Sequence, residues 1–153
     1  MELERPTPRE IILNSIARNR QVIYGQQATN FQIPSNLRKE TKDFDILTRK
    51  PKESAENLTK ELNKYYPNRY KISPAKHKKT FHVKDLTTKE TIADYTGTTK
   101  KPKSYNELGV RYVDLSYSKK KLKQSIKNPN SSFRHEKDKD TLARIKKSKR
   151  FKL

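Results

Sequence analysis

Three aspartates stand in apolar surroundings that are typical of buried strands. Asp43 and Asp45 lie two residues apart in the segment DFDIL, residues 43–47. Because alternate residues of a strand point to the same side, these two carboxylates are expected to project together. Asp94 occupies a similar frame in TIADYT, residues 91–96. Like charges at this spacing repel, and partial burial makes each one more costly, so the arrangement calls for a cationic partner.

A divalent metal is one partner that would remove this repulsion. If the strand of Asp94 lies beside that of Asp43 and Asp45, all three carboxylates converge within about one strand spacing, ~4.8 Å. Mg²⁺ and Mn²⁺ prefer oxygen ligands, and such a cluster suits a pair of metals that binds a triphosphate and activates a hydroxyl. Two simpler alternatives stay open. The aspartates could pair with the nearby Arg38 or Lys42, or they could cap turns.

The pattern around these residues predicts a domain that mixes helices and strands. The clearest helix is expected over residues 52–66, where apolar residues recur at spacings of three and four. Other helices are expected over residues 6–20, 116–128 and 134–147, a helical turn over 26–32, strands over 21–25, 43–47, 69–73, 80–85, 91–96 and 110–115, and loops over 33–41 and 96–109. This order predicts an α/β (α+β) fold, with a core over residues 1–115 and a basic helical extension over 116–153 packed on it.

The order of these motifs resembles the nucleotidyltransferase superfamily, the fold shared by beta-type DNA polymerases, poly(A) polymerases and tRNA CCA-adding enzymes. The family pattern is a strand, a Gly-Ser or Gly-Gly turn that opens a helix, a strand with Asp-x-Asp, and a third Asp on a later strand. Here these are VIYGQQAT, RKETKDFDIL and TIADYT, and FRHEKDKDTLARI is similar to the closing helix. The match spans about residues 20–147 and looks most like small stand-alone nucleotidyltransferases of mobile elements, viruses and toxin–antitoxin systems.

The resemblance implies a mixed sheet flanked by helices and a role for each matching residue. Asp43 and Asp45 would bind both metals, and Asp94 would bind the catalytic metal and activate the acceptor hydroxyl. The nucleotide-binding residues would be Gly25, Gln26, Arg38, Thr41 and Lys137, with Arg134 as a further candidate. Gly25 would let the backbone approach the triphosphate near the amides of the following helix. Gln26 departs from the family pattern, which has Ser or Gly at that position.

Positive charge is concentrated toward the C-terminus. The 153-residue chain has a net charge of +20, and residues 101–153 carry 17 Lys/Arg against 5 Asp/Glu. Such a basic field favours a polyanion, most simply a nucleic acid. The expected nucleic-acid-binding residues are Lys146, Lys147, Lys149 and Arg150 in the segment RIKKSKRFK. A nuclear signal or a solvated helix end would have the same composition.

These observations predict an Mg²⁺-dependent nucleotidyltransferase that moves NMP from an NTP to a hydroxyl acceptor, with the 3′ end of tRNA or another RNA as the expected acceptor. Two alternatives stay open: a toxin-like transferase that modifies a protein or tRNA, and a non-catalytic nucleic-acid-binding module that keeps the fold. The chain has no Cys, which excludes disulfides and thiolate metal sites. No apolar run approaches the roughly 20 residues of a membrane span. The expected location is intracellular: cytoplasmic, or nuclear in a eukaryotic host.

Overall fold

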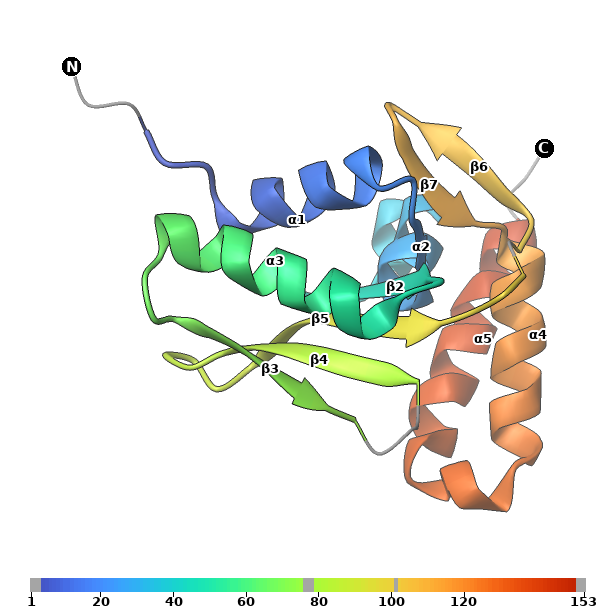
Figure 1. Cartoon of the computed structure of the whole chain (residues 1–153). Helices are drawn as coiled ribbons and strands as arrows, with labels where there is room; N and C mark the ends of the chain where they lie inside the picture. The colour runs from blue at the N-terminus through green and yellow to red at the C-terminus, as the bar shows by residue number, and fades with distance from the viewer. Residues whose placement is uncertain (1–3, 76–78, 101, 151–153) are drawn as a thin grey trace.

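A seven-stranded mixed sheet forms the centre of the fold in the computed structural model (Figure 1). The structure describes residues 4–75, 79–100 and 102–150, except for the side chains of Lys149 and Arg150. The strands are β1 (Val22–Tyr24), β2 (Phe44–Thr48), β3 (Tyr70–Pro74), β4 (Thr80–Asp85), β5 (Thr91–Gly97), β6 (Ser104–Glu107) and β7 (Val110–Val113). They lie in the order β3-β4-β5-β2-β1-β7-β6. β2 runs antiparallel to β1 and parallel to β5, which makes the sheet mixed. The predicted α/β fold is therefore confirmed.

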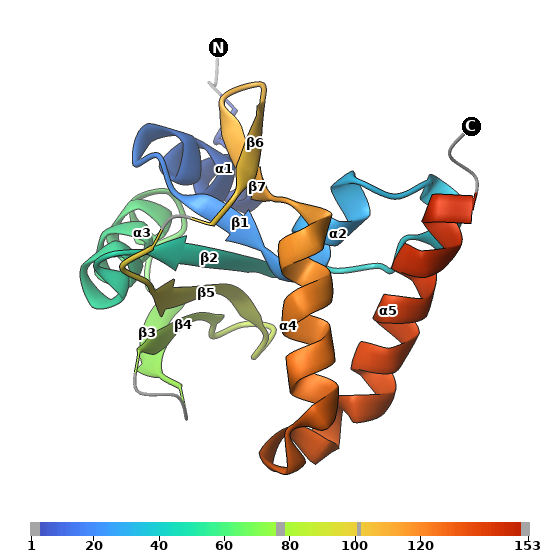
Figure 2. The same ribbon diagram turned by 90° about the vertical axis from the view of Figure 1, so that its right-hand side faces the viewer.

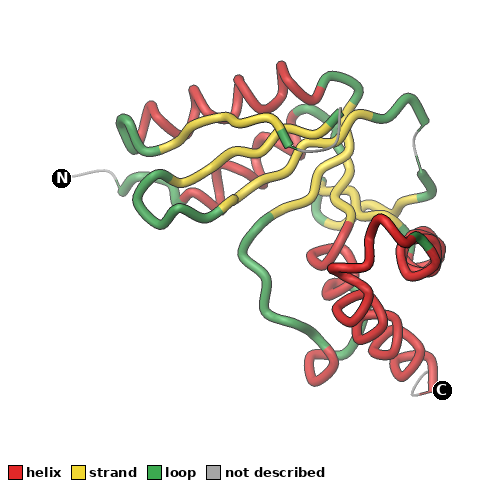
Figure 3. The backbone as a smooth tube through the Cα atoms, turned by 90° about the horizontal axis from the view of Figure 1, so that it is seen from below, coloured by secondary structure: helices red, strands yellow, loops and turns green. Residues whose placement is uncertain are grey.

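Five α-helices and two short 3₁₀ helices surround the sheet in the described part of the chain. They are α1 (Pro8–Arg18), α2 (Gly25–Phe31), η1 (Ser35–Leu37), α3 (Pro51–Tyr65), α4 (Leu115–Lys127), η2 (Pro129–Arg134) and α5 (His135–Arg150). α1 and α3 pack against each other and on the sheet, whereas α4 and α5 stand side by side at one end of the strands (Figures 1 and 2). Seen from below, the α4–α5 pair stands apart from the helices that cover the sheet (Figure 3). No helix that the structure describes is both long and apolar enough to cross a bilayer.

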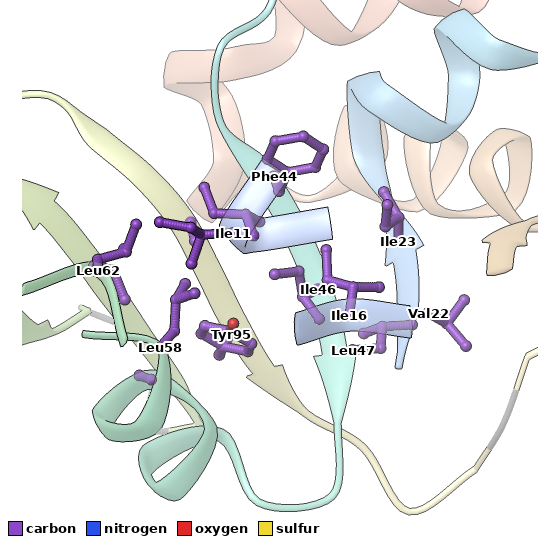
Figure 4. Packing of buried hydrophobic residues seen from close by; sticks show 14 of the residues in the cluster. Ile11, Ile16, Val22, Ile23, Phe44, Ile46, Leu47, Leu58, Leu62 and Tyr95 are labelled. Atoms are coloured by element: carbon purple, nitrogen blue, oxygen red, sulfur yellow. The ribbon is translucent and has the colours of Figure 1, made fainter. Parts of the chain in front are cut away.

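The hydrophobic core lies between the sheet and the helices α1 and α3 (Figure 4). Strand pairing places Ile23, Ile46 and Tyr95 in one row on this side of the sheet, and all three are fully buried. Ile16 of α1 and Leu58 of α3 cover them and are also fully buried. Burial of each such aliphatic side chain contributes roughly 1.5–3 kcal/mol. Because successive strand residues alternate in direction, this core forces the aspartates of β2 and β5 to the opposite side.

The residues that the sequence favours at the start of a helix occupy the start of α1. The Thr7 hydroxyl accepts a hydrogen bond from the Glu10 amide at 3.1 Å, and Pro8 is the first residue of α1. A side-chain oxygen at this position satisfies one of the amides that a helix start leaves unpaired. α1 then ends at Arg18, and the chain turns through Arg20, which has a positive φ of 52°, into β1. This turn leads into β1, an interior strand of the sheet between β2 and β7.

The predicted loop over residues 96–109 is wrong in two places. β5 continues to Gly97, and residues 104–107 form the edge strand β6, which pairs antiparallel with β7. The hairpin turn consists of Leu108 and Gly109, both with positive φ (52° and 86°), a conformation that suits a tight two-residue hairpin. The sequence of β6, SYNE, is polar because an edge strand needs little apolar surface, so its composition is that of a loop.

Candidate active site

A row of four polar side chains crosses the sheet on the side opposite the core. The strand register aligns Tyr24 of β1 with Asp45 of β2, Asp45 with Asp94 of β5, and Asp94 with His82 of β4. Directly paired residues of neighbouring strands point to the same side and approach to about 4.5–5.5 Å. The register therefore makes a continuous polar strip from residues that are separated by up to 70 positions in the sequence. All four side chains are partly buried.

The structure brings Asp43, Asp45 and Asp94 together. One carboxylate oxygen from each lies within 4.8 Å of the others. Asp43 immediately precedes β2 and projects to the side of Asp45, as the two-residue spacing requires. Within the part of the chain that the structure describes, neither Arg38 nor Lys42 forms an ion pair with this triad. These two bases therefore do not neutralise the aspartates through ion pairs.

The electrostatics of the triad disfavour three separate negative charges. Burial, and next the carboxylates of Asp43 and Asp94, raise the pKa of Asp45 to about 8. The charge of Arg134, at the end of η2, acts in the opposite direction and lowers this pKa. A carboxyl group held protonated by burial and by neighbouring carboxylates ionises when a cation binds. Three convergent carboxylate oxygens are also the donor set that Mg²⁺ or Mn²⁺ prefers.

Two hydrogen bonds fix the chain just before β2, where Asp43 lies. The Thr41 hydroxyl donates to Asp43 Oδ1 at 3.1 Å, and the side-chain amide of Gln27 donates to the Asp43 carbonyl oxygen at 3.2 Å. Gln27 belongs to α2, so the helix that follows Gly25 holds the backbone of the first aspartate. Thr41, which the sequence assigned to the nucleotide pocket, thus contacts the triad itself.

Gly25 stands at the junction of β1 and α2 with a φ of +73°. A Cβ atom at this position would overlap Asp45 Oδ2 and lie 3.0 Å from Asp45 Cγ. Gln26, the next residue, turns its side chain along α2: its amide nitrogen donates to Asn30 Oδ1 at 2.7 Å. Its Oε1 accepts from the Thr141 hydroxyl of α5 at 3.5 Å. The side chain of Gln26 is thus engaged by α2 and α5.

The side chains of the other residues assigned to the nucleotide pocket, Arg38 and Lys137, are exposed. The Arg38 guanidinium donates to the Ile33 carbonyl oxygen at 2.9 Å and so folds back on its own loop. The Lys137 side chain is exposed on α5, whereas its carbonyl oxygen accepts from Lys39 Nζ at 3.2 Å. Arg134, also considered from the sequence, contacts Asp138 at 3.5 Å and acts on the pKa of Asp45.

The predicted nucleic-acid-binding residues lie at the end of α5. Lys146 and Lys147 are exposed there. Lys149 and Arg150 continue the helix, but their side chains lie outside the described residues. The arrangement of Lys146 and Lys147 leaves both accessible to a large anion, at the end of α5 remote from Arg134.

His82 lies on the carboxylate side of the sheet, paired with Asp94. Its Nδ1 forms a hydrogen bond with Asp94 Oδ1. Because β4 and β5 pair residue for residue here, the imidazole fixes the rotamer of the third aspartate from the strand beside it. The alternation of Phe81, His82 and Val83 indicates this orientation, because Val83 is fully buried in the core and its neighbour His82 must point to the opposite side of the sheet.

Two tyrosines complete the site and were not singled out in the sequence. The Tyr24 hydroxyl lies 2.9 Å from Thr96 Oγ1, which in turn lies 3.0 Å from Thr80 Oγ1. Burial, and next the charge of Asp45, raise the pKa of Tyr24, so it stays a neutral hydrogen-bonding group. Tyr117 of α4 lines a small hollow together with Gly25 and Gln26. Tyr24 could have been found from its place before Gly25, but Tyr117 reaches the site only through tertiary packing.

Comparisons with known proteins agree with this fold. No protein-family model matches the sequence, and no curated protein matches it either. Solved structures do. The Megavirus polyadenylate synthase aligns over 95% of this chain with a TM-score of 0.81 and 18% identity, and JHP933 from Helicobacter pylori aligns over 92% with a TM-score of 0.52 and 13% identity. This chain spans 31% of the first protein's length and 63% of the second's. The chain therefore has a nucleotidyltransferase-like fold.

Proposed function

We propose that the chain is a metal-dependent nucleotidyltransferase that moves NMP from an NTP to a hydroxyl group of an acceptor. The observation that carries this proposal is the convergence of Asp43, Asp45 and Asp94 on neighbouring strands, within 4.8 Å, beside the turn at Gly25. The polyadenylate synthase of the comparison, by its name, catalyses chemistry of this class. The fold similarity and the carboxylates are independent observations, and both support the same reaction.

The residues present fit a divalent cation. The cluster offers three carboxylate oxygens, and burial together with the repulsion from Asp43 and Asp94 raises the pKa of Asp45. Asp43, Asp45 and Asp94 would hold Mg²⁺ or Mn²⁺. The metal would supply charge neutralisation at the triphosphate and a lower pKa for the attacking hydroxyl.

The reaction replaces a phosphoanhydride bond of the NTP by a phosphoester bond to the acceptor. The acceptor oxygen forms a bond to the α-phosphorus while the bond from that phosphorus to the bridging oxygen breaks, and pyrophosphate leaves with that electron pair. Asp94 is the residue we assign to the acceptor hydroxyl and its departing proton, because His82 holds its carboxylate in one orientation. Thr41 donates a hydrogen bond to the carboxylate of Asp43, and Gln27 donates one to its backbone carbonyl oxygen. The carboxylate is therefore positioned before substrate arrives. Such pre-organisation lowers the cost of reaching the transition state.

The acceptor that we propose is a nucleic acid, the 3′ end of an RNA and of tRNA in particular. The net charge of +20 and the exposed lysines of α4 and α5 support a polyanionic partner. Lys119, Lys120, Lys123 and Lys127 line a shallow hollow of about 350 Å³ along α4. Tyr117 at the start of α4 lines a small hollow together with Gly25, so α4 links this basic surface with the turn beside Asp45.

The test is incubation of the chain with Mg²⁺, each of the four labelled NTPs in turn, and total RNA. We expect label in RNA, with one NTP preferred, and no label when EDTA replaces Mg²⁺. Label in protein would support the toxin-like alternative for the acceptor. The absence of label from both RNA and protein, with every NTP and with Mn²⁺ as well, would contradict the proposed transfer.

A further inference from the structure

A large cavity in the described chain lies away from the triad, at the opposite end of β2. It has a volume of about 460 Å³, which falls in the range of roughly 300–1,000 Å³ that is typical of small-ligand sites. Val22 and Leu47, which pair across β1 and β2, form part of its wall. They stand two residues along their strands from Tyr24 and Asp45, or about 7 Å at 3.3–3.4 Å per residue.

Four segments that are distant in the sequence build this cavity. They are the turn between α1 and β1, the end of β2 with the residues that follow it, the first two turns of α3, and the connection after β5. In Figure 1 these segments come together where β2 and β5 end and α3 begins. Three polar side chains join the first three segments: Gln21 Nε2 donates to Ser54 Oγ at 3.1 Å, and Ser54 Oγ lies 3.2 Å from Thr48 Oγ1. The cavity is thus walled by segments that hydrogen bonds hold together.

The lining of the cavity is cationic. It contains Arg20, Arg49, Lys50 and Lys100 against a single acid, Glu53. Glu53 already faces Lys50 at 3.6 Å. Among the residues that the structure describes, Arg20, Arg49 and Lys100 form no ion pair. Three cations around one hollow whose single carboxylate already faces Lys50 repel one another, and a phosphate group removes that repulsion.

Two further features favour a phosphate attached to a larger polar group. α3 is a 15-residue helix whose start lines the cavity, and the partial positive charge of a helix N-terminus adds to the field of the arginines. Gln21 is only 7% exposed, yet its Oε1 has no hydrogen-bond partner in the described chain. The amides of Asn19 and Asn57 and the apolar surfaces of Val22 and Pro102 complete the lining. This combination suits a sugar and a base beside the phosphate.

We propose that this cavity is a second nucleotide site, which takes a nucleoside monophosphate unit, either as a free nucleotide or as one unit of a nucleic-acid strand. The phosphate lies against Arg49 and Lys100, and the nucleoside lies toward the amides. The site is separate from the triad and does not depend on metal or on transfer. If the ligand is one unit of a nucleic-acid strand, the inference rests on the proposed function. The cavity would then hold the acceptor nucleic acid a short distance from its 3′ end at the triad.

The experiment follows the side-chain amide signals of Asn19, Gln21 and Asn57 by nitrogen-15 NMR, in EDTA so that binding at the triad does not contribute. One arm titrates AMP, and the other titrates a single-stranded adenylate decamer. The test variant is Arg49→Ala with Lys100→Ala. The matched control is Lys60→Ala, an exposed lysine farther along α3 that does not line the cavity.

We expect saturable shifts of the three amide signals, with affinity at least tenfold weaker in the double variant and unchanged in Lys60→Ala. Shifts with AMP identify a free nucleotide as a sufficient ligand, and shifts with the decamer alone identify a strand. The proposal is overturned if neither ligand moves these signals, or if the double variant binds as tightly as the parent. Because no metal and no NTP are present, this result is independent of whether the transfer assay succeeds.

Discussion

The α-carbon of Gly25 faces the carboxylate of Asp45 so closely that a methyl group on Gly25 would overlap Asp45 Oδ2. This relationship joins the turn between β1 and α2 to the centre of the triad. The sequence suggested that Gly25 spares room for a triphosphate. The structure shows that it first spares room for a carboxylate of the triad, while its φ of +73° lets the chain turn directly from strand to helix.

Replacement of Gly25 by Ala should therefore cost more stability than a positive φ alone explains. Gly109 offers the matched control, because it has a φ of +86° and nothing within 4 Å of an added Cβ. Gly109→Ala should cost about 1–2 kcal/mol for the left-handed conformation. Gly25→Ala should cost clearly more and should also weaken Mn²⁺ binding, because Asp45 must move. Urea denaturation of both variants measures the difference, and equal costs would contradict the contact with Asp45.

The raised pKa of Asp45 predicts how stability depends on pH in the absence of metal. The folded state keeps a proton on Asp45 up to about pH 8, whereas an unfolded aspartate loses it near its ordinary pKa of about 4. The folded state thus binds more protons in this window, so the free energy of unfolding should fall as pH rises from about 4 to about 8. Asp45→Asn should remove this slope, and the exposed control Glu56→Gln should keep it. The measurement is a series of thermal melts in EDTA; a slope that survives in Asp45→Asn would refute the assignment.

Saturating Mg²⁺ should abolish this pH trend, because the cation-bound folded state holds no proton on Asp45. Because the cation binds the ionised triad, its affinity should rise with pH up to about 8, and binding should release a proton from Asp45. Calorimetry in two buffers with different ionisation enthalpies measures the number of protons released. Binding without proton release at a pH of about 6.5, well below the pKa of Asp45, would show that this carboxyl is already ionised in the metal-free protein.

The end of α5 should contribute to nucleic-acid binding. Replacement of Lys146, Lys147, Lys149 and Arg150 by Ala should weaken RNA binding and reduce the slope of log affinity against log salt by roughly 0.7–0.9 for each phosphate that the variant no longer neutralises. The matched control replaces Lys60 and Lys84, two exposed lysines on α3 and β4. Filter binding over a range of salt concentrations measures the slope. An unchanged slope in the α5 variant would place the binding surface elsewhere, with α4 as the next candidate.

The parts of the site that follow from local alternation were predictable from the sequence. The two-residue spacing of Asp43 and Asp45 dictates a shared side, and Asp94 lies in an apolar frame that marks a neighbouring strand. The core residues of α3 follow in the same way from helical spacing. Alternation and spacing are properties of the backbone, so they need no knowledge of the rest of the fold.

The parts that depend on which elements meet in space were not predictable. His82 becomes a partner of Asp94 only because β4 adds to the edge of β5 in one register. The carboxylate beside Gly25 and the arrival of Tyr117 from α4 depend on the packing of separate elements. β6 was not predicted, because a polar edge strand gains its stability from backbone pairing rather than from apolar side chains.

The most direct test of the central claim is the rate of NMP transfer by Asp94→Asn relative to the parent, at saturating Mg²⁺ and NTP. Asparagine keeps the size of the side chain and can still bond to His82, but it removes the charge that would hold the metal and receive the hydroxyl proton. The rate should fall by about 10²–10⁴-fold, with the thermal melt unchanged and Glu56→Gln fully active. A transfer rate equal to that of the parent would show that the cluster of Asp43, Asp45 and Asp94 is not the catalytic centre.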